Sequence, residues 1–357
     1  MSIVIKRDDV VISADGQVAG HEAGDTLVRR LLRIFPGSVL VGPVARRGTS
    51  RGTSGFDVLP LGMIDPAHSV VINMDVVDSP QVYLALAGGS PSSQVPRIMN
   101  FVWRPVASGT DEVATAATAL SCALFPTFAN SERTASEIRE LVQRWAVQPL
   151  AEKARLSWVN LGFRLDHIQP RDPADPPVVL YPAIYLSRNK RPDLFLEVVD
   201  RVRRQVPLRM EMRLHESHLV SERAMAVSRR DWAWVGPLMA TRSSYWQALA
   251  RTTAFLATAQ EESYGLLYVE ALGAGVVGVM PDRPWARALV PQGYPFLYRD
   301  AAQAEEMLVR ALRAPQACRA QMDECADGSF ASWIAAHHSD DAFDRAVVHR
   351  VQEWFGT

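Results

Sequence analysis

The sequence predicts an α/β protein made of two doubly wound domains. Short apolar runs alternate with longer helical patterns along the chain, as in parallel sheets covered by helices. The chain has 357 residues, more than one typical core accommodates. Residues 169–177 contain four prolines, which remove backbone donors and lock φ, so we place the domain boundary there. We therefore expect an N-terminal domain over residues 1–170 and a C-terminal domain over residues 175–335.

Apolar runs and helical spacing define the elements of the first domain. We predict strands over residues 38–41, 70–74, 97–102 and 123–125. Helices are expected over residues 26–35 and 131–145, and Ser131 has the side chain of an N-cap for the second of these.

The same alternation resumes after the proline-rich stretch. We predict strands over residues 178–185, 208–214, 232–235, 253–257 and 276–280, with helices over 192–204, 243–250 and 266–274 between them. A last helix within residues 342–357 has aromatic residues at its end, and we expect it to pack back on the first domain.

Composition excludes several classes of protein. The formal net charge is −1, so no bulk attraction to nucleic acid or to an anionic membrane is expected. No apolar run reaches the roughly 18 residues of a membrane span, and residues 1–10 do not read as a secretory signal, so we expect a cytoplasmic protein. Cys122, Cys318 and Cys325 have no CxxC spacing, which argues against a disulfide framework and a structural zinc site.

Two glutamates follow the predicted strand 253–257. In open α/β sheets ligands bind beyond the carboxyl ends of strands, which is where Glu262 falls. Gly265 allows close backbone approach, and the helix that begins there offers free N–H groups to a phosphate. Glu262 and Glu270 are acceptors suited to hydroxyl-rich ligands. The alternative is that Glu261 and Glu262 cap the helix and Glu270 faces solvent, but the run Val-Glu-Ala-Leu-Gly-Ala-Gly around Glu270 is too apolar for a solvent face.

A basic cluster precedes the predicted helix 192–204. Pro192 suits the first helical position, so Arg188, Lys190 and Arg191 crowd the positive end of the helix dipole. Such crowding is unfavourable unless an anion joins the cluster, and a diphosphate would do so through charge-assisted hydrogen bonds. Lysine is rare in this sequence, which draws attention to Lys190. The alternative is a solvated basic turn.

The segment from Glu262 to Gly275 resembles the donor motif E-x7-E of family 4 of the retaining glycosyltransferases. Residues 129–136, 159–170 and 234–238 are similar to further motifs of that family in the same order. The resemblance implies a catalytic set made of Glu262, Lys190 and Arg188. It also implies donor contacts from Glu270, Gly265, Leu266, Tyr264, Ser263, Gly236, Pro237 and Leu238. The family's usual arginine after the strand falls at Ile184 or Tyr185, and Arg188 is the expected substitute.

The resemblance also implies the GT-B fold, in which two Rossmann-like domains face a central cleft. The implied reaction is a retaining, hexosyltransferase-type transfer from a nucleoside-diphosphate sugar to a small-molecule or glycan acceptor. It would proceed by front-face attack, with no protein nucleophile and no cofactor. No metal is expected, since Asp75 and Asp78 do not form a DxD motif. The base, the sugar and the acceptor stay open, as does assembly into a homodimer.

The first domain offers weaker acceptor-side candidates. Gly20 and His21 lie in a glycine-rich loop where the family lines its cleft, although a flexible loop with a solvent-facing histidine explains them equally. Asn100, Trp103 and Arg104 lie where the family often has a histidine near the sugar.

Two rival functions are compatible with these patterns. One is a GT-B epimerase or phosphorylase that acts on the same kind of ligand. The other is a non-catalytic accessory protein that keeps the fold, favoured by the missing histidine and the displaced arginine.

Overall fold

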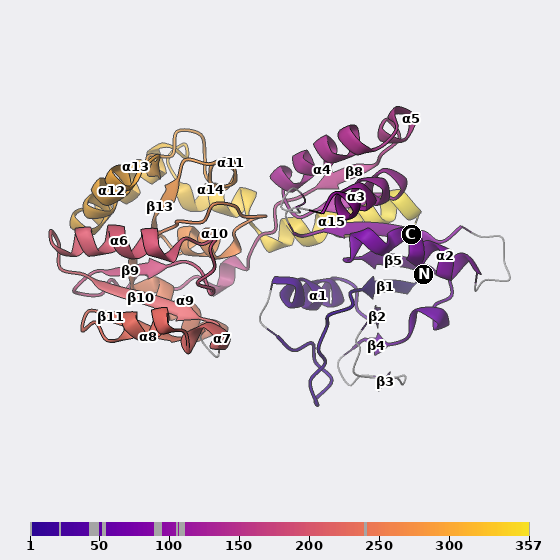
Figure 1. Ribbon diagram of the computed structural model, residues 1–357, viewed down its shortest axis with the longest axis horizontal. Helices are drawn as coiled ribbons and strands as arrows, with labels where there is room; N and C mark the ends of the chain where they lie inside the picture. The colour runs from indigo at the N-terminus through magenta and orange to yellow at the C-terminus, as the bar shows by residue number, and fades with distance from the viewer. Residues whose placement is uncertain are drawn as a thin grey trace. The chain divides into compact units, whose positions relative to one another are not determined.

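The computed structural model describes residues 2–20, 23–42, 50–51, 55–88, 95–104, 106, 111–238 and 241–356. The chain forms two compact units: residues 1–160 with 343–357, and residues 161–342. In each unit a sheet forms the central layer with helices around it (Figure 1). Within the described residues, none of the helices combines the length and apolarity that a membrane crossing would require.

The first unit contains a sheet with the strand order β3-β4-β2-β1-β5-β6-β7-β8. Only β3 and β4 pair antiparallel among its described strands. The strands are β1 (Ser2–Lys6), β2 (Val39–Val41), β3 (Ser50–Arg51), β4 (Asp57–Val58), β5 (Ser69–Asn73), β6 (Arg97–Val102), β7 (Thr127–Ala129) and β8 (Leu156–Trp158). The helices are α1 (Ala23–Ile34), α2 (Ser79–Gly88), α3 (Glu112–Leu124), α4 (Glu132–Trp145) and α5 (Gln148–Ala151).

The second unit contains a parallel sheet with the order β11-β10-β9-β12-β13-β14. The strands are β9 (Val178–Tyr181), β10 (Arg209–Leu214), β11 (Ala233–Pro237), β12 (Thr252–Leu256), β13 (Val277–Pro281) and β14 (Leu297–Tyr298). The helices are α6 (Pro192–Arg203), α7 (Glu216–Leu219), α8 (Glu222–Ser228), α9 (Arg242–Arg251), α10 (Leu266–Gly273), α11 (Pro284–Arg287), α12 (Ala301–Arg313), α13 (Pro315–Glu324) and α14 (Phe330–His337).

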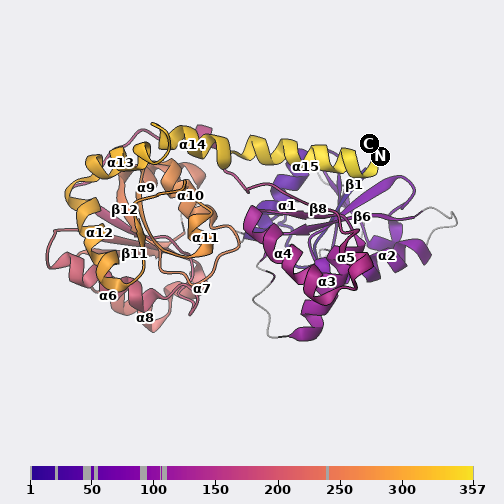
Figure 2. The same cartoon turned by 90° about the horizontal axis from the view of Figure 1, so that it is seen from above.

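The last helix, α15 (Asp340–Phe355), starts in the second unit and ends in the first. Phe343 is fully buried there, with its ring centroid 6.0 Å from that of Phe101 and 6.3 Å from that of Phe128. Arg30 donates to Asp344 at 2.8 Å. The C-terminal end of α15 lies beside the start of β1 within the first unit in both views (Figures 1 and 2).

The predicted α/β fold with two doubly wound sheets is confirmed, and among the details that differ from the prediction three have a clear physical cause. Residues 123–125 end α3 rather than forming a strand, because Asp111 caps a helix whose run of small residues continues to Leu124, and the strand follows at β7. Strand β1 has no counterpart among the predicted strands, since its five residues end in a charged side chain, that of Lys6.

The third difference concerns the domain boundary, which precedes the proline-rich stretch 169–177 instead of falling within it. The guanidinium of Arg171 donates to the carbonyls of Leu249 at 2.8 Å and of Ala274 at 3.3 Å. The amide of Asp172 donates to the carbonyl of Ala250 at 3.1 Å. These bonds attach the stretch to the second unit because the carbonyls at helix C-termini lack partners within their own helices.

Candidate functional site

The carboxyl ends of β9 and β12 define a topological switch point in the second sheet. From β9 the chain proceeds to β10 and β11 on one side, whereas β12 leads to β13 and β14 on the other. A crevice forms outside the strand ends where the order reverses, and ligands of open α/β sheets bind in such crevices. The loops 182–191 and 257–265 leave the two strands at this point.

These two loops are joined by hydrogen bonds. The side chain of Asn189 donates to the carbonyl of Glu261 at 2.8 Å and accepts from its amide at 3.0 Å. The amide of Gln260 donates to the carbonyl of Asn189 at 2.8 Å, and the hydroxyl of Thr258 donates to the carbonyl of Lys190 at 2.7 Å. The backbone on both sides of the switch point is therefore held in one arrangement.

Lys190 and Glu262 form an ion pair across these loops. Their side chains are 20% and 13% exposed, so the charges interact more strongly than a surface pair would. The hydroxyl of Tyr268 donates to the same oxygen of Glu262 at 2.7 Å. Burial, together with the negative charge of Glu262, raises the pKa of Tyr268 well above its usual value, so the phenol stays a donor.

Glu270 lies on the buried side of α10. It is 1% exposed, and one carboxylate oxygen accepts from the hydroxyl of Tyr245 of α9 at 2.9 Å. The prediction that Glu270 does not face bulk solvent is confirmed. A buried carboxylate needs donors around it, and Tyr245 supplies one of them.

Gly265 is the N-cap of α10, with a φ of 86° that favours glycine. A Cβ at this position would lie 2.6 Å from Cδ2 of Tyr268, so the backbone passes directly against that ring. The amides of Leu266 and Leu267 start the helix and have no partner within it, which directs two donors towards the switch point.

The other predicted residues of this loop lie differently. Ser263 is half-buried. Tyr264 is buried, and its hydroxyl lies 2.6 Å from Nδ1 of His338 at the end of α14. The Tyr264 side chain therefore anchors the loop to the body of the unit through its polar end.

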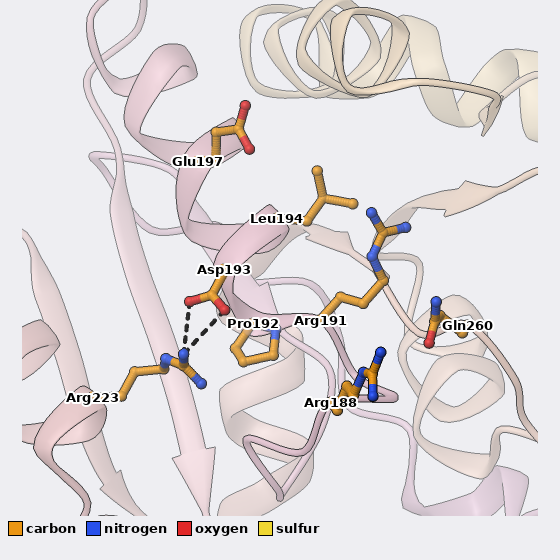
Figure 3. Close-up of a pocket in the computed structure, with 8 residues that line it drawn as sticks. All are labelled: Arg188, Arg191, Pro192, Asp193, Leu194, Glu197, Arg223 and Gln260. Atoms are coloured by element: carbon orange, nitrogen blue, oxygen red, sulfur yellow. Dashed lines mark hydrogen bonds and ion pairs between the residues drawn. The ribbon is translucent and has the colours of Figure 1, made fainter.

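Arg188 faces an open hollow of about 590 Å³ at the start of α6, together with Arg191 and Gln260 (Figure 3). Arg191 has a φ of 47°, uncommon for a residue other than glycine. Among the described residues, neither arginine side chain has a hydrogen-bond or ion-pair partner. The remaining residues around the hollow are Pro192, Asp193, Leu194, Glu197 and Arg223. The hollow thus presents two unpaired cations, while Lys190, Glu262 and Glu270 are not among the residues that line it.

Gly236, Pro237 and Leu238 lie at the carboxyl end of β11, two strands from β9. The ring of Trp234 occupies the space that a side chain at Gly236 would need. The guanidinium of Arg213 lies 4.7 Å from the centre of that ring. Gly236 is therefore required by local packing, whatever ligand the edge binds.

Asn100 lies within β6 in the first unit, and Trp103 follows the last residue of that strand. Asn100 is fully buried, accepts from the hydroxyl of Ser79 at 2.6 Å and donates to the carbonyl of Ser121 at 3.0 Å, which favours a structural role. The indole of Trp103 donates to the carbonyl of Met74 at 3.3 Å.

Arg104 and Gly20 complete the acceptor-side residues that the structure describes. The exposed Arg104 has its guanidinium 4.3 Å from the Trp103 ring centre. Gly20 has a φ of 93° and leaves no room for a side chain beside Asp25. His21 lies outside the described residues.

Two partners of the glutamates were not found from the sequence. Tyr268 follows Glu262 by six positions, and Tyr245 precedes Glu270 by 25. Neither spacing carries a motif, so only the fold reveals the two bonds. In the described part of the chain, no three His, Cys, Asp or Glu side chains are grouped as metal ligands.

The sequence matches no family model and no curated protein. The structure is similar to Anabaena HepE in complex with UDP, at 12% identity and a TM-score of 0.71, over 99% of this chain and 100% of that chain. It is also similar to sucrose-phosphate synthase from Thermosynechococcus elongatus, at 12% identity and a TM-score of 0.69, over 100% of both chains. For α,α-trehalose 6-phosphate synthase from Burkholderia multivorans the identity is 12% and the TM-score 0.69, over 99% of this chain and 97% of that chain. These likenesses show that the chain has the GT-B fold.

Proposed function

We propose that this protein is a retaining glycosyltransferase that transfers a hexosyl group from a nucleoside-diphosphate sugar to a small-molecule or glycan acceptor. A fold hosts many functions, so the proposal depends on the site. The observation that carries it is the ion pair between Lys190 and Glu262 at the switch point of the second sheet.

The charges around the switch point suit a sugar diphosphate. Lys190 supplies a cation beside the strand ends, and Arg188 supplies a second one from the same loop. Glu262 accepts hydrogen bonds and can hold sugar hydroxyls, while the amides of Gly265 and Leu266 face the phosphates. In the free protein Glu262 neutralises Lys190, and the entering diphosphate takes over part of that role.

We assign the nucleoside to the side of Glu270. Its carboxylate would accept from the ribose hydroxyls, and Tyr245 holds it in place. The backbone at Gly236, Pro237 and Leu238 would contact the base from the end of β11. Arg104, the exposed cation stacked on Trp103, is our candidate for an acceptor contact in the first unit.

The proposed reaction needs no protein nucleophile. The bond between the anomeric carbon and the phosphate oxygen breaks, and the bond to the acceptor oxygen forms on the same face. The acceptor proton passes to the departing phosphate oxygen. The leaving diphosphate gains negative charge, which the fixed cations Lys190 and Arg188 stabilise without a metal or other cofactor.

We also propose that the protein acts in the cytoplasm. Cys122, Cys318 and Cys325 are free thiols, and two of them are buried. Unpaired cysteines suit a reducing compartment.

The first experiment measures thermal stability with UDP, GDP, ADP and TDP. A nucleotide at about a hundred times its Kd stabilises the folded state by about 2.7 kcal/mol. The matching nucleotide sugar is then incubated with acceptor mixtures, and free nucleotide is measured. Release that requires acceptor supports transfer, whereas release without acceptor argues against it. No stabilisation by any of the four nucleotides contradicts the proposal and favours a non-catalytic protein.

A further inference from the structure

Three aromatic rings meet at the carboxyl end of β10, outside the groups used above. The ring centroid of Tyr185 lies 5.4 Å from that of His215 and 5.3 Å from that of His218. The amide of His215 donates to the carbonyl of Ile184 at 2.9 Å, which ties the loop after β9 to the end of β10. Both histidines are half-buried.

The backbone determines which nitrogen of each imidazole carries the proton. Nδ1 of His218 accepts from the amide of Leu186 at 3.3 Å. Nδ1 of His215 accepts from the amide of Ser217 at 3.3 Å and caps α7, and it also lies 2.8 Å from the hydroxyl of Ser217, which can donate to the same nitrogen. A ring nitrogen that accepts carries no proton, so each neutral imidazole has its hydrogen on Nε2. Within the described residues neither Nε2 has a hydrogen-bond partner.

This protonation pattern limits the ligand that the histidines can take. An Nε2 that carries hydrogen has no free lone pair, so it cannot bind a metal ion, and Nδ1 is already occupied by an amide. The two groups are instead a pair of N–H donors. Such a pair suits a ligand with several acceptor oxygens.

The position of the pair indicates which part of the ligand those oxygens belong to. The sheet order places β10 next to β9, and β9 next to β12. Neighbouring strands lie about 4.8 Å apart, so the end of β10 is roughly 10 Å from that of β12. Arg188, Lys190 and Arg191 lie on the loop that runs between the two ends, so the most anionic part of a ligand is drawn to this stretch of the edge.

We propose that His215 and His218 donate Nε2–H hydrogen bonds to the phosphate oxygens of the donor diphosphate, from the side opposite Glu262. This inference rests on the proposed function and names two further residues of the same site. The histidines would hold the leaving group between β10 and β12, while Tyr185 keeps the two imidazoles apart and in place.

The test uses the full chain and inorganic diphosphate as the probe. Long-range proton–nitrogen NMR spectra of the histidine side chains report the tautomer and the environment of each ring. We expect two imidazoles of the Nε2–H tautomer to shift on titration with inorganic diphosphate. Their assignment follows from the single variants H215N and H218N. An asparagine oxygen can replace Nδ1 as the acceptor of the same amide, and asparagine is a favoured N-cap, so the variants keep this bond while they lose the Nε2–H donor and the ring contact with Tyr185.

The double variant H215N/H218N should bind inorganic diphosphate and the stabilising nucleoside diphosphate about tenfold more weakly, while affinity for the nucleoside without phosphates is unchanged. H68N, which alters an exposed histidine of the first unit, is the matched control and should leave all three affinities unchanged. Unchanged imidazole signals, unchanged diphosphate affinity, or an equal loss of nucleoside affinity would each overturn the inference. If a nucleoside diphosphate still stabilises the wild type, the proposed function survives that outcome; if none does, both fail.

Discussion

One oxygen of the Glu262 carboxylate accepts from both the ammonium of Lys190 and the hydroxyl of Tyr268. The three side chains come from the loop after β9, the loop after β12 and the helix α10. Glu262 and the ammonium of Lys190 therefore have fixed positions before any ligand arrives, and a fixed cation is what electrostatic stabilisation of an anionic leaving group requires.

Replacing Lys190 by methionine should reduce transfer at least about a hundredfold, because the departing diphosphate loses its fixed cation. It should also destabilise the fold by about 1–3 kcal/mol, since the partly buried Glu262 loses its charged donor. Initial rates of nucleotide release and urea unfolding measure the two effects. K153M, at an exposed lysine of the first unit, is the control.

The double variant K190M/E262Q separates stability from activity. Removing both charges together should recover part of the lost stability, because no uncompensated carboxylate remains. Activity should stay at the level of the single variant. A double variant that regains transfer would contradict the role given to Lys190.

Replacing Gly265 by alanine should lower the free energy of unfolding more than the same replacement at Gly293. Both glycines have a left-handed backbone, with φ of 86° and 83°. Alanine in the left-handed region lowers the stability of the folded state by about 1–2 kcal/mol at either position. At Gly265 the new Cβ would also lie 2.6 Å from the Tyr268 ring, whereas at Gly293 it would have no atom within 4 Å. We expect G265A to lower the unfolding free energy by more than G293A and to weaken nucleotide binding, which G293A should leave unchanged. Equal effects would show that the close approach to Tyr268 is unimportant.

Replacing Glu270 by glutamine should weaken nucleoside-diphosphate binding about tenfold, because an amide accepts less strongly than a carboxylate from the ribose hydroxyls. The glutamine oxygen can still accept from Tyr245, so the melting temperature should change little. Titration calorimetry with the stabilising nucleotide provides the measurement. A large loss of stability with unchanged affinity would make Glu270 a structural residue only.

His338 should make stability depend on pH below neutrality. Burial, and secondarily the charge of His337, lowers the pKa of His338 from 6.5 to about 4. Between these values the unfolded chain binds a proton that the folded chain does not, so stability falls as pH drops from about 6.5 to about 4, by about 3 kcal/mol in total. Above pH 6.5 both states are neutral and the contribution is constant.

The variant H338N should show a shallower fall. Its side-chain oxygen can still accept from the hydroxyl of Tyr264, but it does not titrate. Unfolding free energies at several pH values between 4 and 7 compare the two proteins. Parallel curves would exclude His338 as a source of the dependence, whatever the absolute stability of the variant.

Chelation should leave transfer intact. In the proposed reaction Lys190 and Arg188 stabilise the negative charge of the leaving diphosphate without a metal ion. EDTA should therefore not lower the initial rate by more than a small factor. The control is a parallel assay with added magnesium. Activity that disappears in EDTA and returns with magnesium would contradict the metal-independent step.

Local patterns were sufficient for the fold class and for about half of the strands and helices. The apolar run 97–102 became β6, and Ser131 caps α4 by accepting from the amide of Thr134, as predicted. Such features depend on neighbours within a few residues, which the sequence displays directly. The strand 253–257 matches β12 to within one residue, but the predicted strand 178–185 is too long, because β9 ends at Tyr181 and the next residue, Pro182, has no amide to donate. Lys190 and Glu262 still lie in the loops that follow these two strands, as predicted.

The sequence by itself therefore determined the type and approximate bounds of these elements. It also determined which side chains follow the strands. Only the tertiary structure decided that Lys190 meets Glu262, 72 positions further along the chain, and that Tyr268 and Tyr245 support the two glutamates. It also showed Asn100 in a buried network and β1 at the centre of the first sheet. The physical reason is that these contacts depend on the order of the strands and on pairing between residues far apart in the sequence. The spacing between the partners follows no motif, so the sequence near each residue does not indicate its partner.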